Sequence, residues 1–255
     1  MRHSLRYYAD LLTVLLATEL KVRYKSTVLG YAWSVLYPLA FAGVFFLVFS
    51  VYMRVRIDNY ALFLIAGLFP WQWFANCANG AHAHFLRSGS LLKKVCFPRS
   101  LLVVADILNN MIHFLLSVPV IVVFMLFYRA YPAACWLWAV PLLVAVQFMF
   151  ALGFALLVAT ANLFFRDLER LVAIGTMIWF YLTPVFYHVN MIPPHLRWLV
   201  YVNPMASLTV CWRSVFLNGV LPWDMLAAAA GFAVVMLAVG YRVYSAYEWR
   251  FAEVV

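Results

Sequence analysis

The chain is built mainly from long runs of apolar residues. Each run is close to or above the length of about 20 mostly apolar residues that a helix needs to cross the hydrocarbon core of a membrane. The runs lie near 31–53, 60–83, 101–127, 135–161, 171–187 and 225–246. A membrane barrel would need short segments that alternate apolar and polar residues, and these continuous runs argue against it. The pattern predicts an all-α integral membrane protein with six transmembrane helices, forming a single domain over residues 1–255.

Residues 4–25 precede the first run and follow a different pattern. One side of a helix there would carry apolar residues at helical spacing, namely Leu5, Tyr8, Leu11, Leu12, Leu15, Leu16 and Leu20. The other side would carry Arg6, Asp10, Thr13, Lys21 and Lys25. This predicts an amphipathic helix lying in the cytoplasmic interface with its cations on anionic headgroups. The alternative is that these cations only orient the first span. Gly30 would then let the chain turn into that span.

Composition and charge support the membrane interpretation. Only 11% of the residues are charged and 67% are hydrophobic, whereas soluble domains carry about 25% charged residues. The 18 Lys and Arg residues outnumber the 9 Asp and Glu residues, and most of the cations fall in segments that six crossings would place on one side. The positive-inside rule explains this bias without a nucleic acid partner and places both termini in the cytoplasm. The four cysteines form no CxxC pair, so no disulfide framework is indicated.

The loop between the second and third runs reads HFLRSGSLLKKVCFPRS. Ser88 or Ser90 can cap a short helix over Leu91–Val95, which Pro98 would end. Such a helix suits contact with a soluble partner, and a plain positively charged loop is the alternative.

Two runs contain rows of polar residues on one helix face. The third run carries Asp106, Asn109, Asn110, His113 and Ser117, and the second run carries Gln72, Asn76 and Asn79. Polar groups inside a span can mark a functional site. Hydrogen bonding between packed helices is the interpretation we favour. His82 and His84 diverge on a helix, so no metal site is expected there.

The segment between the last two runs is apolar but repeatedly broken by proline. This favours short helices over residues 190–217 that dip into the outer leaflet and return.

The first run carries an aromatic stripe in which Tyr37, Phe41, Phe45 and Phe49 recur at every fourth residue. Tyr31 and Ser34 lie on nearly the same side. Such a stripe either faces lipid or the protein core, or lines a passage in which sugar rings stack on aromatic faces. Periodicity alone leaves both interpretations open.

Motifs for catalysis are absent from the sequence. No Gly is followed by Lys, so there is no Walker A loop for ATP, and neither HExxH nor GxSxG occurs. The expectation is a non-enzymatic conduit or scaffold without a cofactor of its own.

Four stretches together resemble a known family. They are ELKVRYKSTVLGYAWSVLYPL, GLFPWQWF with the downstream SLLKKVCFPRS, NLFFRDLERLV, and LTPVFYHVNMIPPHLRWLVYVNPM. In this order the chain resembles the membrane subunit of ABC-2 type polysaccharide exporters, and more closely the permease that exports lipid-linked O antigen. The similarity runs from the amphipathic segment to the C-terminus.

The resemblance implies a homodimer around a channel in the bacterial inner membrane, driven by a pair of separate ABC ATPase subunits that bind ATP and Mg. The substrate would be a polysaccharide on an undecaprenyl pyrophosphate lipid. The implied channel lining is Tyr31, Ser34, Tyr37, Phe41 and Phe45. The implied cytoplasmic mouth for the lipid headgroup is Lys21, Arg23, Lys25, Gly30 and Arg87. The implied ATPase-coupling segment is Ser90, Leu91, Leu92, Lys93, Lys94, Val95, Phe97, Pro98 and Arg99. The implied periplasmic gate is Pro193, Pro194, Trp198, Tyr201, Asn203 and Pro204.

Other functions stay open at this point. The chain could export capsular polysaccharide or teichoic acid, or small lipophilic compounds. A membrane glycosyltransferase or ligase acting on the carrier lipid would need catalytic acids at a membrane face. Asp58 and Asp224 are the few acids expected on the periplasmic side.

Overall fold

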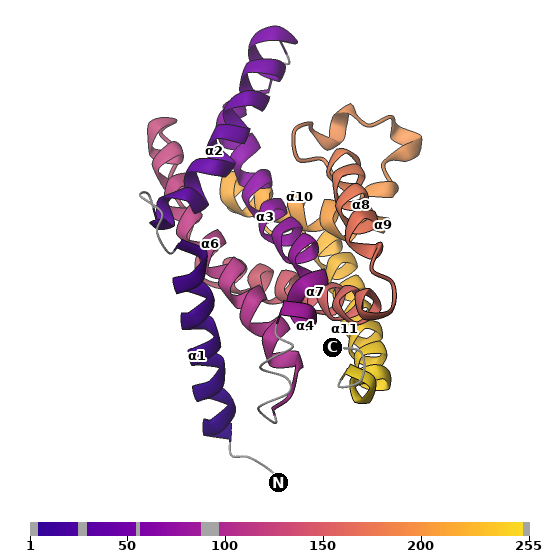
Figure 1. Cartoon of the computed structure of the whole chain (residues 1–255). Helices are drawn as coiled ribbons and strands as arrows, with labels where there is room; N and C mark the ends of the chain where they lie inside the picture. The colour runs from indigo at the N-terminus through magenta and orange to yellow at the C-terminus, as the bar shows by residue number, and fades with distance from the viewer. Residues whose placement is uncertain (1–4, 25–29, 55–56, 88–96, 252–255) are drawn as a thin grey trace.

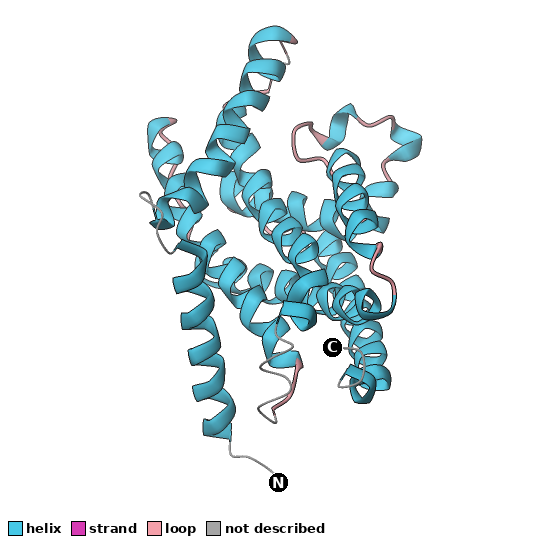
Figure 2. Cartoon of the chain, viewed as in Figure 1, coloured by secondary structure: helices cyan, strands magenta, loops and turns pink. Residues whose placement is uncertain are grey.

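The computed structural model describes residues 5–24, 30–54, 57–87 and 97–251, and all regular structure within these ranges is helical (Figures 1 and 2). The elements up to residue 87 are α1 (Leu5–Tyr24), η1 (Gly30–Ala32), α2 (Trp33–Phe45), η2 (Phe46–Tyr52), α3 (Tyr60–Gly80), η3 (Ala81–Ala83) and α4 (His84–Arg87). The later elements are α6 (Ser100–Phe127), α7 (Trp136–Phe164), α8 (Leu168–Leu182), η4 (Val189–Met191), η5 (Pro194–Leu196), α9 (Leu199–Val202), α10 (Pro204–Asn218), α11 (Trp223–Tyr247) and η6 (Glu248–Arg250). The all-α prediction is confirmed for these ranges.

Five helices among the described residues are long and apolar enough to cross a membrane. They are Val35–Tyr52, Tyr60–Ala83, Ser100–Phe127, Trp136–Phe164 and Trp223–Arg250. The run predicted at 171–187 forms the 15-residue α8, which at 1.5 Å per residue is about 22 Å long, against about 30 Å of hydrocarbon. The helix ends early because Thr183 adopts an extended conformation before Pro184, as the residue before a proline tends to do. The sixth span therefore stays a prediction.

Helix α1 matches the predicted amphipathic segment within one residue at each end. Leu11, Leu12, Leu15 and Leu16 are half-buried. Asp10, Thr13 and Lys21 are exposed, and the helix packs against α6. The backbone of Gly30 has φ +48°, a left-handed conformation that favours glycine and suits the predicted turn. The position of α1 in a membrane interface stays a prediction.

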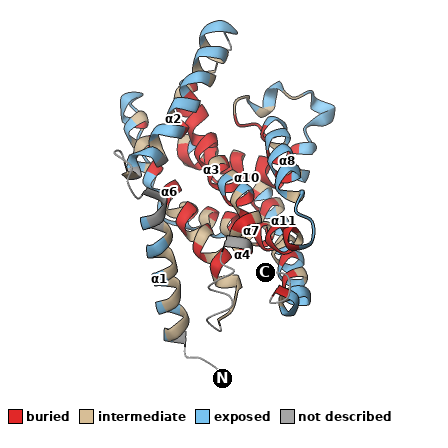
Figure 3. Cartoon of the chain, in the orientation of Figure 1, coloured by how far each residue is buried: buried red, intermediate tan, exposed pale blue. Residues whose placement is uncertain are grey.

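Helix α3 forms the centre of the fold. Figure 3 shows buried residues gathered around α3, α7 and α10, with exposed residues along α2 and α8. Apart from its polar row, α3 is apolar, and such a helix is expected to be largely surrounded by other helices. The fully buried Gln147 of α7 bonds to both α3 and α10. Its Nε2 donates to the carbonyl of Pro70 in α3 at 2.7 Å, and its Oε1 accepts from Trp212 Nε1 in α10 at 2.6 Å. One amide side chain thus ties α3, α7 and α10 together.

Helices α7 and α11 approach each other backbone to backbone. A Cβ atom on Gly240 would overlap the carbonyl oxygen of Gly153, and one on Gly153 would overlap the backbone of Met236 and Leu237. Small residues permit such close contact between membrane helices. These two glycines hold α7 and α11 as one packed pair.

The end of α11 packs between α4 and the start of α6. Phe251 is buried and its ring centroid lies 4.7 Å from that of Phe85. Arg99 Nη1 donates to the carbonyl of Glu248 at 2.7 Å, and the Tyr244 hydroxyl accepts from the backbone N–H of Ser100 at 3.0 Å. The C-terminal part of the described chain therefore holds the segment that leads into α6.

Candidate functional site

A groove of about 440 Å³ opens between α2, α3 and α8. Its aromatic lining residues are Tyr37, Phe41, Trp71, Phe180 and Tyr181, and its polar lining residues are Gln72, Asn76, Asn79 and Thr176. The groove therefore presents ring faces and amide groups together.

The aromatic side follows from helical spacing. Tyr37 and Phe41 are four residues apart and lie on one face of α2. Tyr37 and Tyr181 are largely exposed. The ring of Phe180 packs 5.6 Å from Trp71 and 6.1 Å from Phe41, centroid to centroid. These contacts join three helices into one wall with exposed aromatic faces.

The amide side comes from the polar row of α3. Asn76 and Asn79 are exposed and Gln72 is half-buried. The Thr176 hydroxyl donates to Asn79 Oδ1 at 3.0 Å and so links α8 to α3. Asn79 therefore takes part in the interhelical bonding that the sequence favoured, while Asn76 presents its amide to the groove.

Phe45, one turn of α2 beyond Phe41, is not among the residues that line the groove. Its ring centroid is 4.9 Å from Phe41 and 5.5 Å from Phe186, which follows α8. Tyr31 lies in η1 and Ser34 in α2, but their side chains are outside the described part of the chain. Of the five predicted lining residues, Tyr37 and Phe41 thus line the groove and Phe45 packs at its end.

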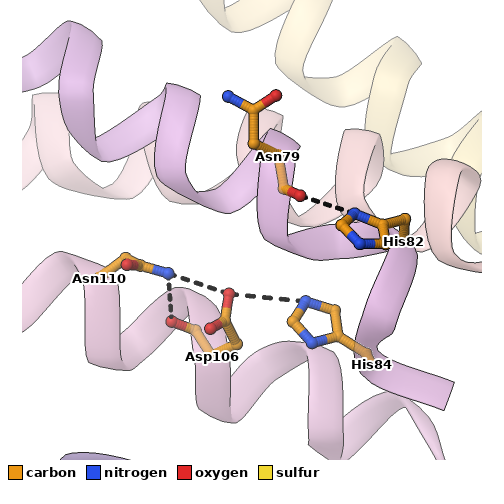
Figure 4. Close-up of polar contacts among 5 residues, drawn as sticks. All are labelled: Asn79, His82, His84, Asp106 and Asn110. Atoms are coloured by element: carbon orange, nitrogen blue, oxygen red, sulfur yellow. Dashed lines mark hydrogen bonds and ion pairs between the residues drawn. The ribbon is translucent and has the colours of Figure 1, made fainter. Parts of the chain in front are cut away.

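A second polar cluster lies where α3 passes through η3 into α4 (Figure 4). The His82 ring contacts the carbonyl of Asn79 at 2.7 Å and Glu169 of α8 at 3.5 Å. His84 turns toward Asp106 of α6, with 3.5 Å between His84 Nε2 and Asp106 Oδ2.

Asn110 Nδ2 donates to the same Asp106 oxygen at 2.9 Å. Part of the polar row of α6 thus bonds within its own helix, and the contact of Asp106 with His84 of α4 is of the interhelical kind that the sequence favoured. Within the described residues, no group of three or more His, Cys, Asp or Glu side chains is placed to hold a metal ion.

The predicted headgroup residues are described only in part. Lys21 is exposed on α1, Arg23 also lies in α1, and Arg87 lies in α4, while Lys25 falls outside the described residues. Their common role at a cytoplasmic mouth stays a prediction.

The predicted coupling segment also falls mostly outside the described residues, which holds for Ser90, Leu91, Leu92, Lys93, Lys94 and Val95. Phe97, Pro98 and Arg99 are described and half-buried. The Arg99 guanidinium bonds to the C-terminal segment, as given above, and lies 5.6 Å from the centroid of the Phe251 ring. An ATPase contact at this segment stays a prediction.

The predicted gate region folds into the short helices that its prolines indicated. Asn203 caps α10, because its Oδ1 accepts from the N–H groups of Met205 and Ala206 at 3.1 Å. The same oxygen accepts from Trp179 Nε1 of α8 at 2.7 Å. Pro204, the first residue of α10, is buried.

The exposed Tyr201 donates to Asp224 of α11 at 2.7 Å, and this hydrogen bond, with burial, raises the pKa of the Tyr201 phenol. Pro193, Pro194 and Trp198 are exposed. Whether these helices re-enter a membrane stays a prediction.

Sequence reasoning missed Arg213, which it did not single out. The residue is buried in α10 and donates hydrogen bonds to backbone carbonyls of two other segments. The only sequence signal is a single cation in the otherwise apolar stretch TVCWRSVF.

The fold is that of a multi-pass helical membrane protein, and its groove is lined by aromatic and amide side chains. The chain belongs to the ABC-2 type transporter family, which matches residues 10–217. The family expected from the four sequence stretches is thereby confirmed.

Similar proteins cover the whole chain. Two proteins from Klebsiella pneumoniae, each named O-antigen export system permease protein RfbA, are 42% identical over 254 residues, which is 100% of this chain and 98% of theirs. A protein of the same name from Myxococcus xanthus is 33% identical over 256 residues, covering 98% of this chain and 97% of its own.

Proposed function

We propose that this chain is the channel-forming permease subunit of an ATP-driven exporter that moves lipid-linked O antigen across the bacterial inner membrane. The observation that carries the proposal is the groove between α2, α3 and α8, with its combined aromatic and amide lining. The names of the relatives, at 42% and 33% identity over nearly full lengths, support the same substrate class.

The chemistry of the groove suits a glycan. Sugar rings carry apolar faces that stack on aromatic rings such as Tyr37 and Tyr181, and an amide such as Asn76 can both donate to and accept from sugar hydroxyls. A small lipophilic compound would gain nothing from the exposed amides. The lining therefore favours a polyhydroxylated substrate over a lipophilic one.

A complete channel requires a second copy of the chain. The groove is open on one side, and only 11% of the residues in the span Val35–Tyr52 are buried in the single chain. A homodimer that places two such grooves face to face would enclose a passage. In this arrangement α8 acts as a sixth, short span, and α9 and α10 enter the outer leaflet.

Energy comes from a separate subunit, and carrier recognition comes from residues of this chain outside the groove. Because the sequence lacks a phosphate-binding loop, ATP and Mg are bound by a separate ABC ATPase pair. Arg23 and Lys25, with Lys21 and Arg87, hold the pyrophosphate of the undecaprenyl carrier at the cytoplasmic mouth through charge-assisted hydrogen bonds.

The test replaces groove aromatics in cells that depend on this chain for export. The double variant Tyr37→Ala/Phe41→Ala should lower surface O antigen and leave lipid-linked glycan in the cytoplasm, with the protein present at normal amounts. The matched control is Val44→Ala/Leu47→Ala, which changes two exposed residues of α2 and η2 outside the groove lining. Equal export by both variants would refute the groove as the path.

A further inference from the structure

Arg213 lies in α10 with only 7% of its surface exposed. Its guanidinium group donates three hydrogen bonds, from Nε to the carbonyl of Phe63 at 3.2 Å, from Nη1 to that of Pro184 at 2.9 Å, and from Nη2 to that of Val185 at 2.8 Å. The guanidinium carbon lies 3.6 Å from the centroid of the Phe63 ring. Within the described residues no carboxylate forms an ion pair with it. Burying a charged side chain in apolar surroundings costs free energy unless hydrogen bonds compensate for the lost water. The three hydrogen bonds to carbonyls supply that compensation and fix the position of the guanidinium.

The bonded segment has no regular structure of its own. Backbone carbonyls in such a segment need partners when they are buried. The carbonyls of Pro184 and Val185 receive theirs from Arg213, and the next carbonyl, that of Phe186, accepts from the hydroxyl of Tyr60 on α3 at 2.9 Å. Three consecutive carbonyls are thus held by side chains of two other helices. We refer to these contacts of Arg213 and Tyr60 as the carbonyl clamp.

The carbonyl clamp determines the position of one aromatic side chain. The ring centroid of Phe186 lies 5.1 Å from Phe49, 5.5 Å from Phe45 and 5.7 Å from Phe180. Phe180 lines the groove, and Phe45 packs against the groove residue Phe41. Phe186 therefore bridges α8 and the α2–η2 stripe next to the groove residue Phe180, and this place is called the end of the groove below.

We propose that Arg213 is the positioning residue of a gate, in which the carbonyl clamp holds Phe186 across the end of the groove and its release opens that end. The inference rests on the proposed function of the groove as the glycan path. A substrate leaving through this end would displace Phe186 from the aromatic cluster. The carbonyl clamp would then return Phe186 to its place.

Gly67 provides an independent way to disturb the clamp. A Cβ atom on this residue of α3 would come within 2.5 Å of Arg213 Nη2 and 3.1 Å of Thr209 Cγ2. Gly67→Ala therefore displaces the guanidinium without removing its charge. Gly231→Ala is the matched control, because a Cβ atom there meets nothing within 4 Å.

The experiment measures how fast a Phe186→Cys thiol reacts with a membrane-impermeant maleimide in intact membranes. The rate follows the fraction of molecules in which the segment is released. Loss of one hydrogen bond from a charged donor shifts that fraction by about tenfold. We expect Gly67→Ala, which displaces Nη2 from the Val185 carbonyl, to raise the rate by about that factor. Arg213→Met removes both bonds to the segment and should raise the rate further, whereas Gly231→Ala should leave it unchanged. Cys77, fully buried in α3, reports the fold in the same sample and should stay unlabelled.

Two results would overturn the inference. One is an unchanged labelling rate in both Arg213→Met and Gly67→Ala. The other is labelling of Cys77 in step with position 186 in both variants, because Arg213 would then support the whole core rather than the gate.

A second readout tests gating itself in the same variants with Phe186 intact. Entry of a small hydrophilic dye through the membrane should rise with Arg213→Met and Gly67→Ala. Faster labelling without dye entry would mean that the clamp holds the segment but that the segment does not block a passage, and the gate would be refuted. Neither readout uses a glycan, so both can succeed even where O-antigen export, and with it the proposed function, fails.

Discussion

Replacing Gln147 with leucine should destabilise the protein through two buried groups at once. The substitution removes the acceptor of the Trp212 indole N–H and the donor to the Pro70 carbonyl, which lie 2.6 and 2.7 Å from the amide. Neither group has ready access to water, because Trp212 and Pro70 are both buried.

The size of the effect can be bounded from two scales. Soluble proteins lose about 1–3 kcal/mol for each buried group left without its partner, which gives about 2–6 kcal/mol for two groups. Hydrogen bonds between membrane helices contribute less, about 0.6 kcal/mol on average and at most about 1.7, because the separated helices also find partners. Two short, fully buried bonds belong near the upper end of the membrane scale, so we expect a loss of about 2–3 kcal/mol. For a chain of this size that corresponds to about 4–12 °C in Tm.

The assay is thermal unfolding of the purified protein in detergent, followed by tryptophan fluorescence. Asn76→Leu is the matched control, since it also replaces an amide with leucine but at an exposed groove position. It should change Tm little while lowering export. If Gln147→Leu unfolds at the same temperature as Asn76→Leu, the bridging role of this amide is refuted.

Two further predictions concern helix packing and coupling. Gly240→Ala should sharply lower the amount of folded protein in the membrane, because its methyl group overlaps the α7 backbone, whereas Gly231→Ala should not, and quantitative blotting of membranes decides between them. Leu92→Asp should leave insertion intact but reduce binding of the ATPase, because an apolar side chain that seats in a partner groove contributes about 1.5–3 kcal/mol. Co-purification measures this, and unchanged ATPase recovery would exclude Leu92 from the contact.

Helix positions could be predicted from the sequence because they depend on local patterns. The apolar runs and the i, i+3, i+4 spacing placed α1 and five long helices within a few residues of their bounds. The length of α8 was overestimated because the apolar run continues past Thr183, although Pro184 ends the helix.

The site was less predictable because it depends on contacts between distant segments. Periodicity placed Tyr37 and Phe41 on one face of α2 but could not show that this face meets Trp71 and Phe180. Arg213 was not singled out because counting cations treats each as solvated. Its burial depends on carbonyls at positions 63, 184 and 185, which no local pattern brings together.

The contact between Gly153 and Gly240 has a mechanical consequence. Where two backbones touch, no side chain lies between them whose rotamer could change to absorb a displacement. Helices α7 and α11 therefore behave as one rigid unit, because sliding one helix along the other would break the backbone contact between Gly153 and Gly240. Helix α2 has no comparable constraint, since few of its residues are buried. We therefore expect strain produced during a transport cycle to fall on α2, which lines the groove, rather than on α7 and α11.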